Sequence, residues 1–421
     1  MRDSVIGREP SDWDISTPAK PDEIRTCFSS YKVIDTGIQH GTVTVLMDGL
    51  SVEITTFRID GEYIDHRRPE SVTFTKDVMQ DLSRRDFTMN AMAYSPTEGL
   101  YDPFDGVSDI ESGIVRCVGD AAARFREDAL RLLRLFRFAA QLEFDVEDES
   151  LNAAVQCRFL LDSISKERIA SELNKILVSE NPRSVLTLLS DTGIMSIIIP
   201  QWKHVIGFEQ FSPYHDRTVD KHIIDATQNA PNDFLVRLSL LLHDIGKPYT
   251  FTVDEDGRGH CYGHEKIGAE LSTNILKRLK YDNKTINSVY NLVLYHDQGF
   301  ETRYSVGKIL DELGTDDFYR LLELKRADAA AHCPSSAKYR LGCADKMAEL
   351  ADEILDGQVV INLKSLNING NHIKDMGLAQ GKEIGLILDR LLDMVMNGEL
   401  ENDYDCLINR AREMHMDKAQ K

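Results

Sequence analysis

Residues 31–60 read YKVIDTGIQHGTVTVLMDGLSVEITTFRID, and this stretch decides the fold of the first part of the chain. From Val43 to Met47 every second side chain is apolar, and a second alternating run begins at Val52. Alternation with a period of two is typical of strands, and Asp48-Gly49 between the two runs predicts a tight hairpin turn. The first region is therefore predicted to contain a β-sheet.

From Asp120 onward the apolar period becomes helical. Leu132, Leu135, Phe136 and Ala139 recur every three to four residues, and similar patterns continue almost to the C-terminus. This period predicts amphipathic helices. The fold class is therefore α+β: a small head that contains a sheet, followed by an all-α remainder that ends in a helical tail.

Composition describes an ordinary globular protein of 421 residues, 28% of them charged. Its first residues resemble no secretory signal, its apolar runs are too short for a membrane span, and its seven cysteines include no Cys-x-x-Cys pair. A cytoplasmic location with reduced thiols is expected. The net charge of −20 argues against a nucleic-acid partner unless a local basic surface exists.

A pair of carboxylates stands upstream of the hairpin. The segment from Ser11 to Thr17 is predicted to be a short strand, which places Asp12 and Asp14 on one face. Magnesium prefers such oxygen ligands together with substrate phosphates. Glu53, in the second strand of the hairpin, would supply a third carboxylate. A solvated acidic strand without a metal is the alternative.

A basic stripe follows on the first long helix. Arg131, Arg134 and Arg137 recur every three residues, so they line one side of the helix, and Asp128 lies one turn before Arg131. A carboxylate beside a guanidinium can discriminate between bases by about 1–3 kcal/mol for each good bidentate contact. The alternative is a surface salt bridge, which contributes less than about 1 kcal/mol.

Taken together and in order, these elements resemble the class II tRNA nucleotidyltransferases, the family that adds CCA to tRNA 3′ ends. The segments that carry the resemblance are Arg2-Asp3-Ser4-Val5-Ile6-Gly7-Arg8, Asp12-Trp13-Asp14, Thr36 to Val45, Arg84 to Ala93, and Glu127 to Arg134. The segment from Phe57 to Leu82 resembles the flexible loop of members that add the complete CCA.

The resemblance implies a role for each matching residue. Asp12 and Asp14 would be the catalytic ligands of Mg2+, and Asp128 with Arg131 would be the protein template for the incoming base. The further nucleotide contacts implied are Arg2, Arg85, Arg134 and Arg137. In the family a strand and a Gly-Gly pair precede the position of Met1, so we expect a misplaced start site, a missing sheet strand and poor binding of nucleotides as written.

Histidines cluster in the second half, where eight of the twelve fall between residues 204 and 332. A lone buried histidine is usually a core residue, but a group of them with aspartates suits a transition metal. This region resembles the HD phosphohydrolase superfamily, for which His222, His243, Asp244 and Asp328 match the core ligands. His264, His296 and Asp297 would complete a second metal position. The identity of the metal stays open.

The predicted organisation has four regions: a nucleotidyltransferase head (1–118), a helical neck that binds RNA and nucleotide (119–205), an HD domain (206–345) and a tRNA-binding tail (346–421). The expected activity is addition of CCA to tRNA from CTP and ATP, with no membrane and no protein partner. Two alternatives remain: an A-adding enzyme or poly(A) polymerase of the same family, and a metal-dependent phosphohydrolase whose head only binds RNA.

Overall fold

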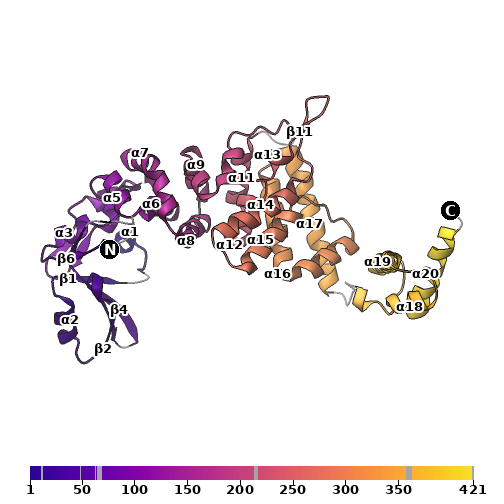
Figure 1. The fold of residues 1–421 in the computed structure, drawn as a ribbon, viewed down its shortest axis with the longest axis horizontal. Coiled ribbons are helices and arrows are strands. Elements are labelled where there is room, and N and C mark those ends of the chain that lie inside the picture. The colour runs from indigo at the N-terminus through magenta and orange to yellow at the C-terminus, as the bar shows by residue number, and fades with distance from the viewer. Residues whose placement is uncertain are drawn as a thin grey trace. The chain divides into compact units, whose positions relative to one another are not determined.

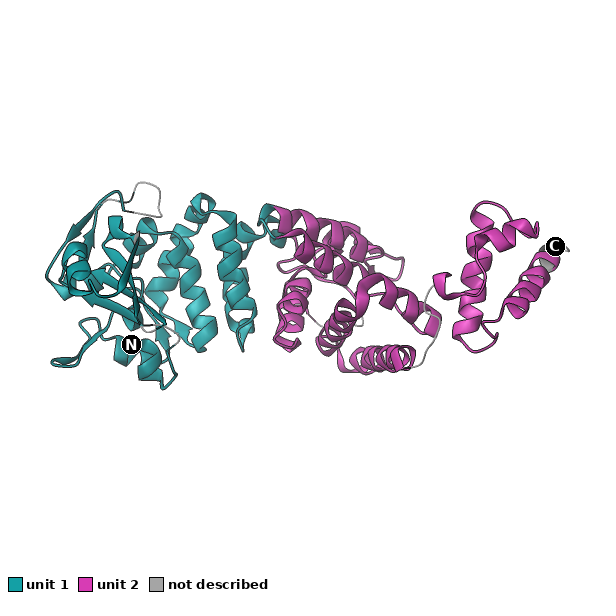
Figure 2. Cartoon of the chain, turned by 90° about the horizontal axis from the view of Figure 1, so that it is seen from below, with its two compact units in different colours: residues 1–203, 278–281 teal, residues 204–277, 282–421 magenta. Residues whose placement is uncertain are grey.

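The computed structural model describes residues 1–10, 13–47, 49–61, 63, 69–212, 217–356 and 363–419. The chain forms two compact units: residues 1–203 with 278–281, and residues 204–277 with 282–421 (Figure 2). Helices dominate outside the head, as Figure 1 shows, so the predicted α+β class is confirmed. Within the described residues, no helix is long and apolar enough to cross a membrane.

The head is built on a four-stranded sheet with the order β1-β4-β3-β2. Its strands are β1 (Asp14–Thr17), β2 (Lys32–Gly37), β3 (Thr42–Met47) and β4 (Leu50–Thr56). β1 runs parallel to β4, and the other pairs are antiparallel. Met47 pairs with Leu50 across the predicted hairpin turn, where Gly49 has a φ of +84°. Glycine suits this turn because it adopts a positive φ without a steric penalty.

Short helices and small sheets complete the first unit. The other strands are β5 (Arg58–Asp60), β6 (Val72–Phe74), β7 (Ala93–Ser95), β8 (Gly99–Tyr101), β9 (Ile114–Val115) and β10 (Asp145–Val146). The helices are α1 (Arg2–Ile6), α2 (Pro21–Cys27), α3 (Val78–Ser83), α4 (Gly106–Glu111), α5 (Ala121–Glu127), α6 (Leu130–Leu142), α7 (Asp148–Cys157), α8 (Lys166–Leu177), α9 (Pro182–Asp191) and α10 (Ile194–Ile198), with 3-10 turns η1 (Ile38–His40), η2 (Thr88–Asn90), η3 (Arg158–Ser163) and η4 (Pro200–His204).

Helix α6 organises the helical part of this unit and contacts α5, α8 and α9. Leu132, Leu135 and Phe136 are fully buried, and burial of such side chains stabilises the fold by about 1.5–3 kcal/mol each. The helical period begins where the sequence predicts it, because the Asp120 carboxylate accepts a hydrogen bond from the Ala123 N–H and caps α5. The buried face of α6 thereby sets where its arginines lie.

The second unit is almost entirely helical. Its elements are α11 (Val219–Asn229), α12 (Phe234–Leu242), α13 (Lys247–Thr250), β11 (Thr252–Val253), β12 (Gly259–His260), α14 (His264–Arg278), α15 (Asn283–Tyr295), α16 (Arg303–Ala330), α17 (Pro334–Asp356), η5 (Leu363–Ser365), α18 (Gly370–Asp375), α19 (Lys382–Met396) and α20 (Tyr404–Ala419). The long helix α16 contacts α11, α12, α15, α17 and α19. Gly314 interrupts α16 with φ 74° and ψ 164°, a conformation that favours glycine.

Candidate functional site

The edge strand β1 carries the acidic part of the head site. Asp14 is in register with Glu53 on the parallel neighbour β4, so both side chains leave the same face of the sheet, and both residues are exposed. The sequence predicted β1 from Ser11, but the strand begins at Asp14. Asp12 lies outside the described residues. The structure therefore places the predicted metal ligand Asp14 next to Glu53, the predicted third carboxylate.

Asn90 connects two of the predicted nucleotide-binding arginines. Arg2 Nη1 donates to Asn90 Oδ1 (3.1 Å), and Arg85 Nη1 donates to the Asn90 carbonyl (3.2 Å). Arg85 Nη2 also donates to Ser16 Oγ (3.4 Å) on β1. Both guanidinium groups are thus held near the strand that bears Asp14, although they come from α1 and from the turn after α3.

Two further arginines of α6 join this cluster. Arg134 Nε donates to Asp86 Oδ2 (2.8 Å), and Asp86 Oδ1 accepts from Asn90 Nδ2 (3.1 Å). Burial would raise the pKa of Asp86, but Arg134 and Asn90 lower it overall. Arg137 lies 4.1 Å from the centre of the Phe138 ring, with Arg2 at 4.9 Å and Arg134 at 5.3 Å from the same ring. Such a collection of guanidinium groups suits phosphate oxygens. We call Arg2, Arg85, Arg134 and Arg137 the arginine cluster.

The two predicted template residues line one cavity of about 590 Å3, together with residues of β2, η1 and β5 and with Arg84, which follows α3. They do not pair with each other. Arg131 Nη1 donates to Glu127 Oε2 (2.6 Å), whereas Asp128 lies 3.4 Å from Arg168. The sequence predicted that Arg131 is part of a basic stripe, but Arg131 is buried. Its Nη2 also donates to the Arg84 carbonyl (2.8 Å). The arrangement leaves both side chains on the wall of the same cavity.

Sequence reasoning missed an ion network that also lines this cavity. Asp60 accepts a hydrogen bond from Tyr63 (2.7 Å), and it pairs with Arg58 (3.1 Å) and Arg84 (3.6 Å). Burial and Asp60 raise the pKa of Tyr63. No local pattern signals this network, because β5 and α3 meet only in the folded head. Glu62 and residues 64–68, within the loop predicted between Phe57 and Leu82, lie outside the described residues.

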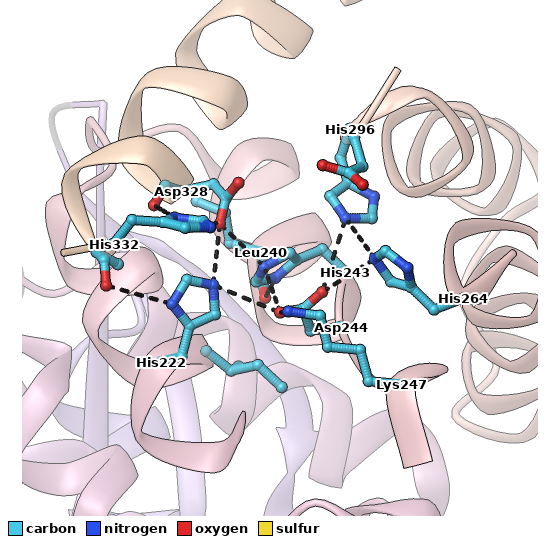
Figure 3. Close-up of polar contacts among 12 residues, drawn as sticks. His222, Leu240, His243, Asp244, Lys247, His264, His296, Asp328 and His332 are labelled. Carbon is cyan, nitrogen blue, oxygen red and sulfur yellow. Dashed lines mark hydrogen bonds and ion pairs between the residues drawn. The ribbon is translucent and has the colours of Figure 1, made fainter. Parts of the chain in front are cut away.

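The second site is a buried group of histidines and aspartates, which we call the HD centre (Figure 3). Its members come from the ends of α12 and α15, the start of α14, the body of α11, and the last turn of α16 with the residues just after it. All of them are at most 9% exposed. They are His222, His243, Asp244, His264, His296, Asp328 and His332.

Asp244 lies between two halves of the HD centre, as Figure 3 shows. Its Oδ1 faces His264 Nε2 (3.4 Å) and His296 Nε2 (3.7 Å). Its Oδ2 faces His222 Nε2 (3.4 Å) and His243 Nε2 (3.3 Å), which Asp328 Oδ1 also approaches to 2.9 and 3.4 Å. A carboxylate that faces two histidine pairs in this way can bridge two metal positions.

The histidine rings are oriented as in metal sites. Nδ1 of His243, His264 and His296 lies 2.7, 2.8 and 2.6 Å from the backbone carbonyl three residues earlier, which turns Nε2 inward. Metal-bound histidines commonly donate their other N–H to such a carbonyl. Within the described residues the buried Nε2 of His243 has no hydrogen-bond partner. These donors therefore fit a metal ion, and the described residues contain three groups able to hold one.

Opposite charges in the HD centre shift the pKa values of its side chains. Burial would lower the pKa of His243, but Asp244 and Asp328 raise it to about 10. Burial would raise the pKa of Asp244, yet His243 and Lys247 hold it well below its ordinary value. Lys247 Nζ lies 2.6 Å from Asp244 Oδ2. Asp244 is therefore ionised.

Two residues depart from the predicted ligand set. Asp297 is not brought to the other ligands: its Oδ1 accepts a hydrogen bond from Arg340 (3.0 Å) on α17. His332, which sequence reasoning missed, lies beside His222 and Asp328, with its ring centre 4.9 Å from that of His222. Its place four residues after Asp328, one helical turn on, is the signal that could have identified it.

Three family models match successive parts of the chain. Residues 1–116 match the poly A polymerase head domain, and residues 203–331 match the HD domain. Between them, residues 143–206 match the probable RNA and SrmB-binding site of polymerase A.

The relatives cover almost the whole chain. A CCA-adding enzyme of Levilactobacillus brevis is 32% identical over 97% of this chain and 90% of its own length. The crystal structure of the Bacillus stearothermophilus CCA-adding enzyme in complex with CTP has a TM-score of 0.67 at 27% identity, over 100% of this chain and 92% of that chain. The Thermotoga maritima enzyme complexed with tRNA shares the fold, with a TM-score of 0.59 at 18% identity over 98% and 89% of the two chains. The chain belongs to the CCA-adding enzyme family of tRNA nucleotidyltransferases and carries an HD domain.

Proposed function

We propose that this protein adds C, C and A to the 3′ ends of tRNA from CTP and ATP, with release of pyrophosphate, in the cytoplasm. The observation that carries the proposal is the arginine cluster, which Asn90 and Ser16 tie to the strand that bears Asp14. Phosphates of a nucleoside triphosphate bound there would lie beside a carboxylate site for divalent ions. Family membership supports the same activity.

We assign the divalent-ion site to Asp12 and Asp14, with Glu53 beside Asp14 on the adjacent strand. Carboxylates on adjacent strands suit Mg2+, which would neutralise phosphate charge and activate the attacking hydroxyl of the RNA when bound. The protein's own part is positioning. Arg2, Arg85, Arg134 and Arg137 would hold the triphosphate, and Asp128 with Arg131 would read the base from the wall of the cavity. No covalent intermediate is needed for such a transfer.

The test uses the purified protein with tRNA that lacks CCA, CTP, ATP and Mg2+, followed by sequencing of the product ends. Complete CCA ends are expected. A reaction with CTP alone separates this activity from an A-adding enzyme or a poly(A) polymerase, because only a CCA-adding enzyme extends the RNA by two C residues. Product ends that carry only A would contradict the proposal.

A second activity is favoured by the HD centre. We propose that His222, His243, Asp244 and Asp328 hold one transition-metal ion and that His264 and His296 with Asp244 hold another. Imidazole and carboxylate donors suit such ions, which would supply an activated water for attack on a phosphoester. The expected substrates are RNA-end phosphates, such as a 2′,3′-cyclic phosphate or a 2′-phosphate. Metal analysis and hydrolysis of 2′,3′-cyclic AMP by the metal-loaded chain test this activity.

We retain the division into a head (1–118), a neck (119–205), an HD domain (206–345) and a tRNA-binding tail (346–421) as part of the proposal. The head and neck would carry nucleotide addition, and the HD domain would act on damaged ends. If the alternative of a phosphohydrolase with an inactive head were correct, removal of the HD ligands would abolish every activity.

A further inference from the structure

Arg340 approaches the HD centre from α17, beyond the part of the chain that matches the HD domain, which ends at residue 331. Its Nη1 lies 3.0 Å from Asp297 Oδ1 and 3.6 Å from Asp328 Oδ2. Asp328 uses its other oxygen, Oδ1, toward His222 and His243. The guanidinium therefore stands directly beside a carboxylate of the HD centre and leaves Asp328 Oδ1 to the histidines.

Only one edge of this guanidinium is engaged. Within the described residues, Nη2 and Nε of Arg340 make no hydrogen bond or ion pair, and the side chain is 34% exposed. Two carboxylates thus fix the orientation of Arg340 through Nη1, whereas its Nη2 and Nε have no partner among the described residues. A planar guanidinium with two free donors matches the geometry of two phosphate oxygens.

Two lysines near the HD centre are each engaged by two partners within the described residues. Lys247 pairs with Asp244 and donates to Gln210 Oε1 (2.8 Å), and its side chain is 8% exposed. Lys325 donates to the carbonyls of His296 and Gln298, both at 2.7 Å. Arg340 is therefore the cation best placed to meet an incoming anion.

We propose that Arg340 binds the phosphate group of the substrate of the HD centre and orients it against the metal ions. This inference rests on the phosphohydrolase function proposed above. The ligand class is a phosphoester or its phosphate product, held by the guanidinium on one side and by the metal ions on the other. A purely structural role, in which Arg340 only ties α17 to Asp297, is the competing explanation.

The experiment measures binding of inorganic phosphate to the full-length, Mn2+-loaded protein by isothermal titration calorimetry, with bound Mn2+ quantified in parallel. The variants are Arg340→Gln and Arg340→Lys. Arg326→Gln is the matched control, because Arg326 on α16 also pairs with an acid of α17, Asp345 at 3.0 Å, and is equally exposed. The His243→Ala variant shows how much phosphate binds to the chain outside the HD centre.

Arg340→Gln is expected to weaken HD-centre phosphate binding by about 10- to 100-fold, as loss of charge-assisted hydrogen bonds does. Mn2+ content should stay at the wild-type level. Arg340→Lys should bind with intermediate affinity, because an ammonium keeps the charge but loses the paired donors. The Arg326→Gln protein should bind like the wild type.

Unchanged phosphate affinity in Arg340→Gln would overturn the inference, and so would a loss of Mn2+ that parallels the loss of phosphate binding, since that would identify a structural role. Wild-type binding no greater than that of His243→Ala would also overturn it. If phosphate binds through Arg340 but 2′,3′-cyclic AMP is not hydrolysed, the phosphohydrolase function fails while the binding site stands.

Discussion

Single side chains in the head are restrained by more than one partner. Arg85 touches both the Asn90 carbonyl and Ser16, and Arg131 touches both Glu127 and the Arg84 carbonyl. Because these side chains are already ordered, less conformational entropy is lost when a nucleotide binds. Substitutions at such positions should therefore change the rate of nucleotide addition and the choice of nucleotide more than they change the affinity for tRNA.

Replacement of Asp14 by alanine should reduce CCA addition at least about 100-fold, because the loss of a metal-binding carboxylate removes several kcal/mol of transition-state stabilisation. Single-turnover addition to tRNA measures this effect, and gel-shift titration should show tRNA affinity nearly unchanged. Asp22→Ala is the matched control, since the Asp22 side chain is 90% exposed on α2. Retained activity in Asp14→Ala would rule out the proposed metal site.

Arg131→Ala should reduce the preference for CTP over UTP about tenfold or more, in keeping with about 1–3 kcal/mol for a bidentate base contact. The comparison of kcat/KM for the two nucleotides measures it, with Arg126→Ala on the exposed side of α5 as the control. Because Arg131 is buried, Asp128→Ala provides a second variant with less effect on folding. An unaltered preference for C in both variants would argue against the template role.

At the level of elements, the junction of η2 and α4 positions the residue that connects the arginines. Asn90 is the last residue of η2, and α4 packs on η2 through Gly106. A Cβ at Gly106 would lie 2.4 Å from the Thr88 carbonyl oxygen. The close approach of these two short elements therefore depends on the absence of a side chain.

Gly106→Ala should lower the free energy of unfolding by about 1–3 kcal/mol, as overpacking does, and should raise KM for CTP because η2 must move. Thermal unfolding and steady-state kinetics measure the two effects. Gly342→Ala on α17 is the control, since a Cβ there would meet no atom within 4 Å. Wild-type stability in Gly106→Ala would show that the junction tolerates a side chain.

On the scale of the whole molecule, the arginine cluster belongs to one compact unit and the HD centre to the other. Each site draws its side chains from its own unit, so substitutions in one should act independently of the other. The two proposed activities can thus be separated by mutation.

The double variant His243→Ala with Asp244→Ala should lose metal from the HD centre and hydrolysis of 2′,3′-cyclic AMP, while CCA addition stays within about twofold of the wild type. Elemental analysis and the two activity assays test this expectation, with circular dichroism as the check on folding. A parallel loss of CCA addition in a folded variant would favour the phosphohydrolase whose head only binds RNA.

Local sequence patterns sufficed to predict the class of each main element and the kinds of side chain available. The alternation around Asp48-Gly49 produced the hairpin, and the cap at Asp120 begins the helical region, because both depend on neighbours within a few residues. The histidines and aspartates of the HD centre were also visible as a set of donors.

Which of these groups come into contact depends on the packing of distant elements. His222 and Asp328 are 106 residues apart in the chain yet 2.9 Å apart in space, whereas Asp297 turns to Arg340 instead of the other ligands. The Asp60 network and the approach of Arg340 likewise depend on how helices and strands pack. Packing is set by the burial of many apolar side chains at once, so no local pattern reports which polar groups it brings into contact.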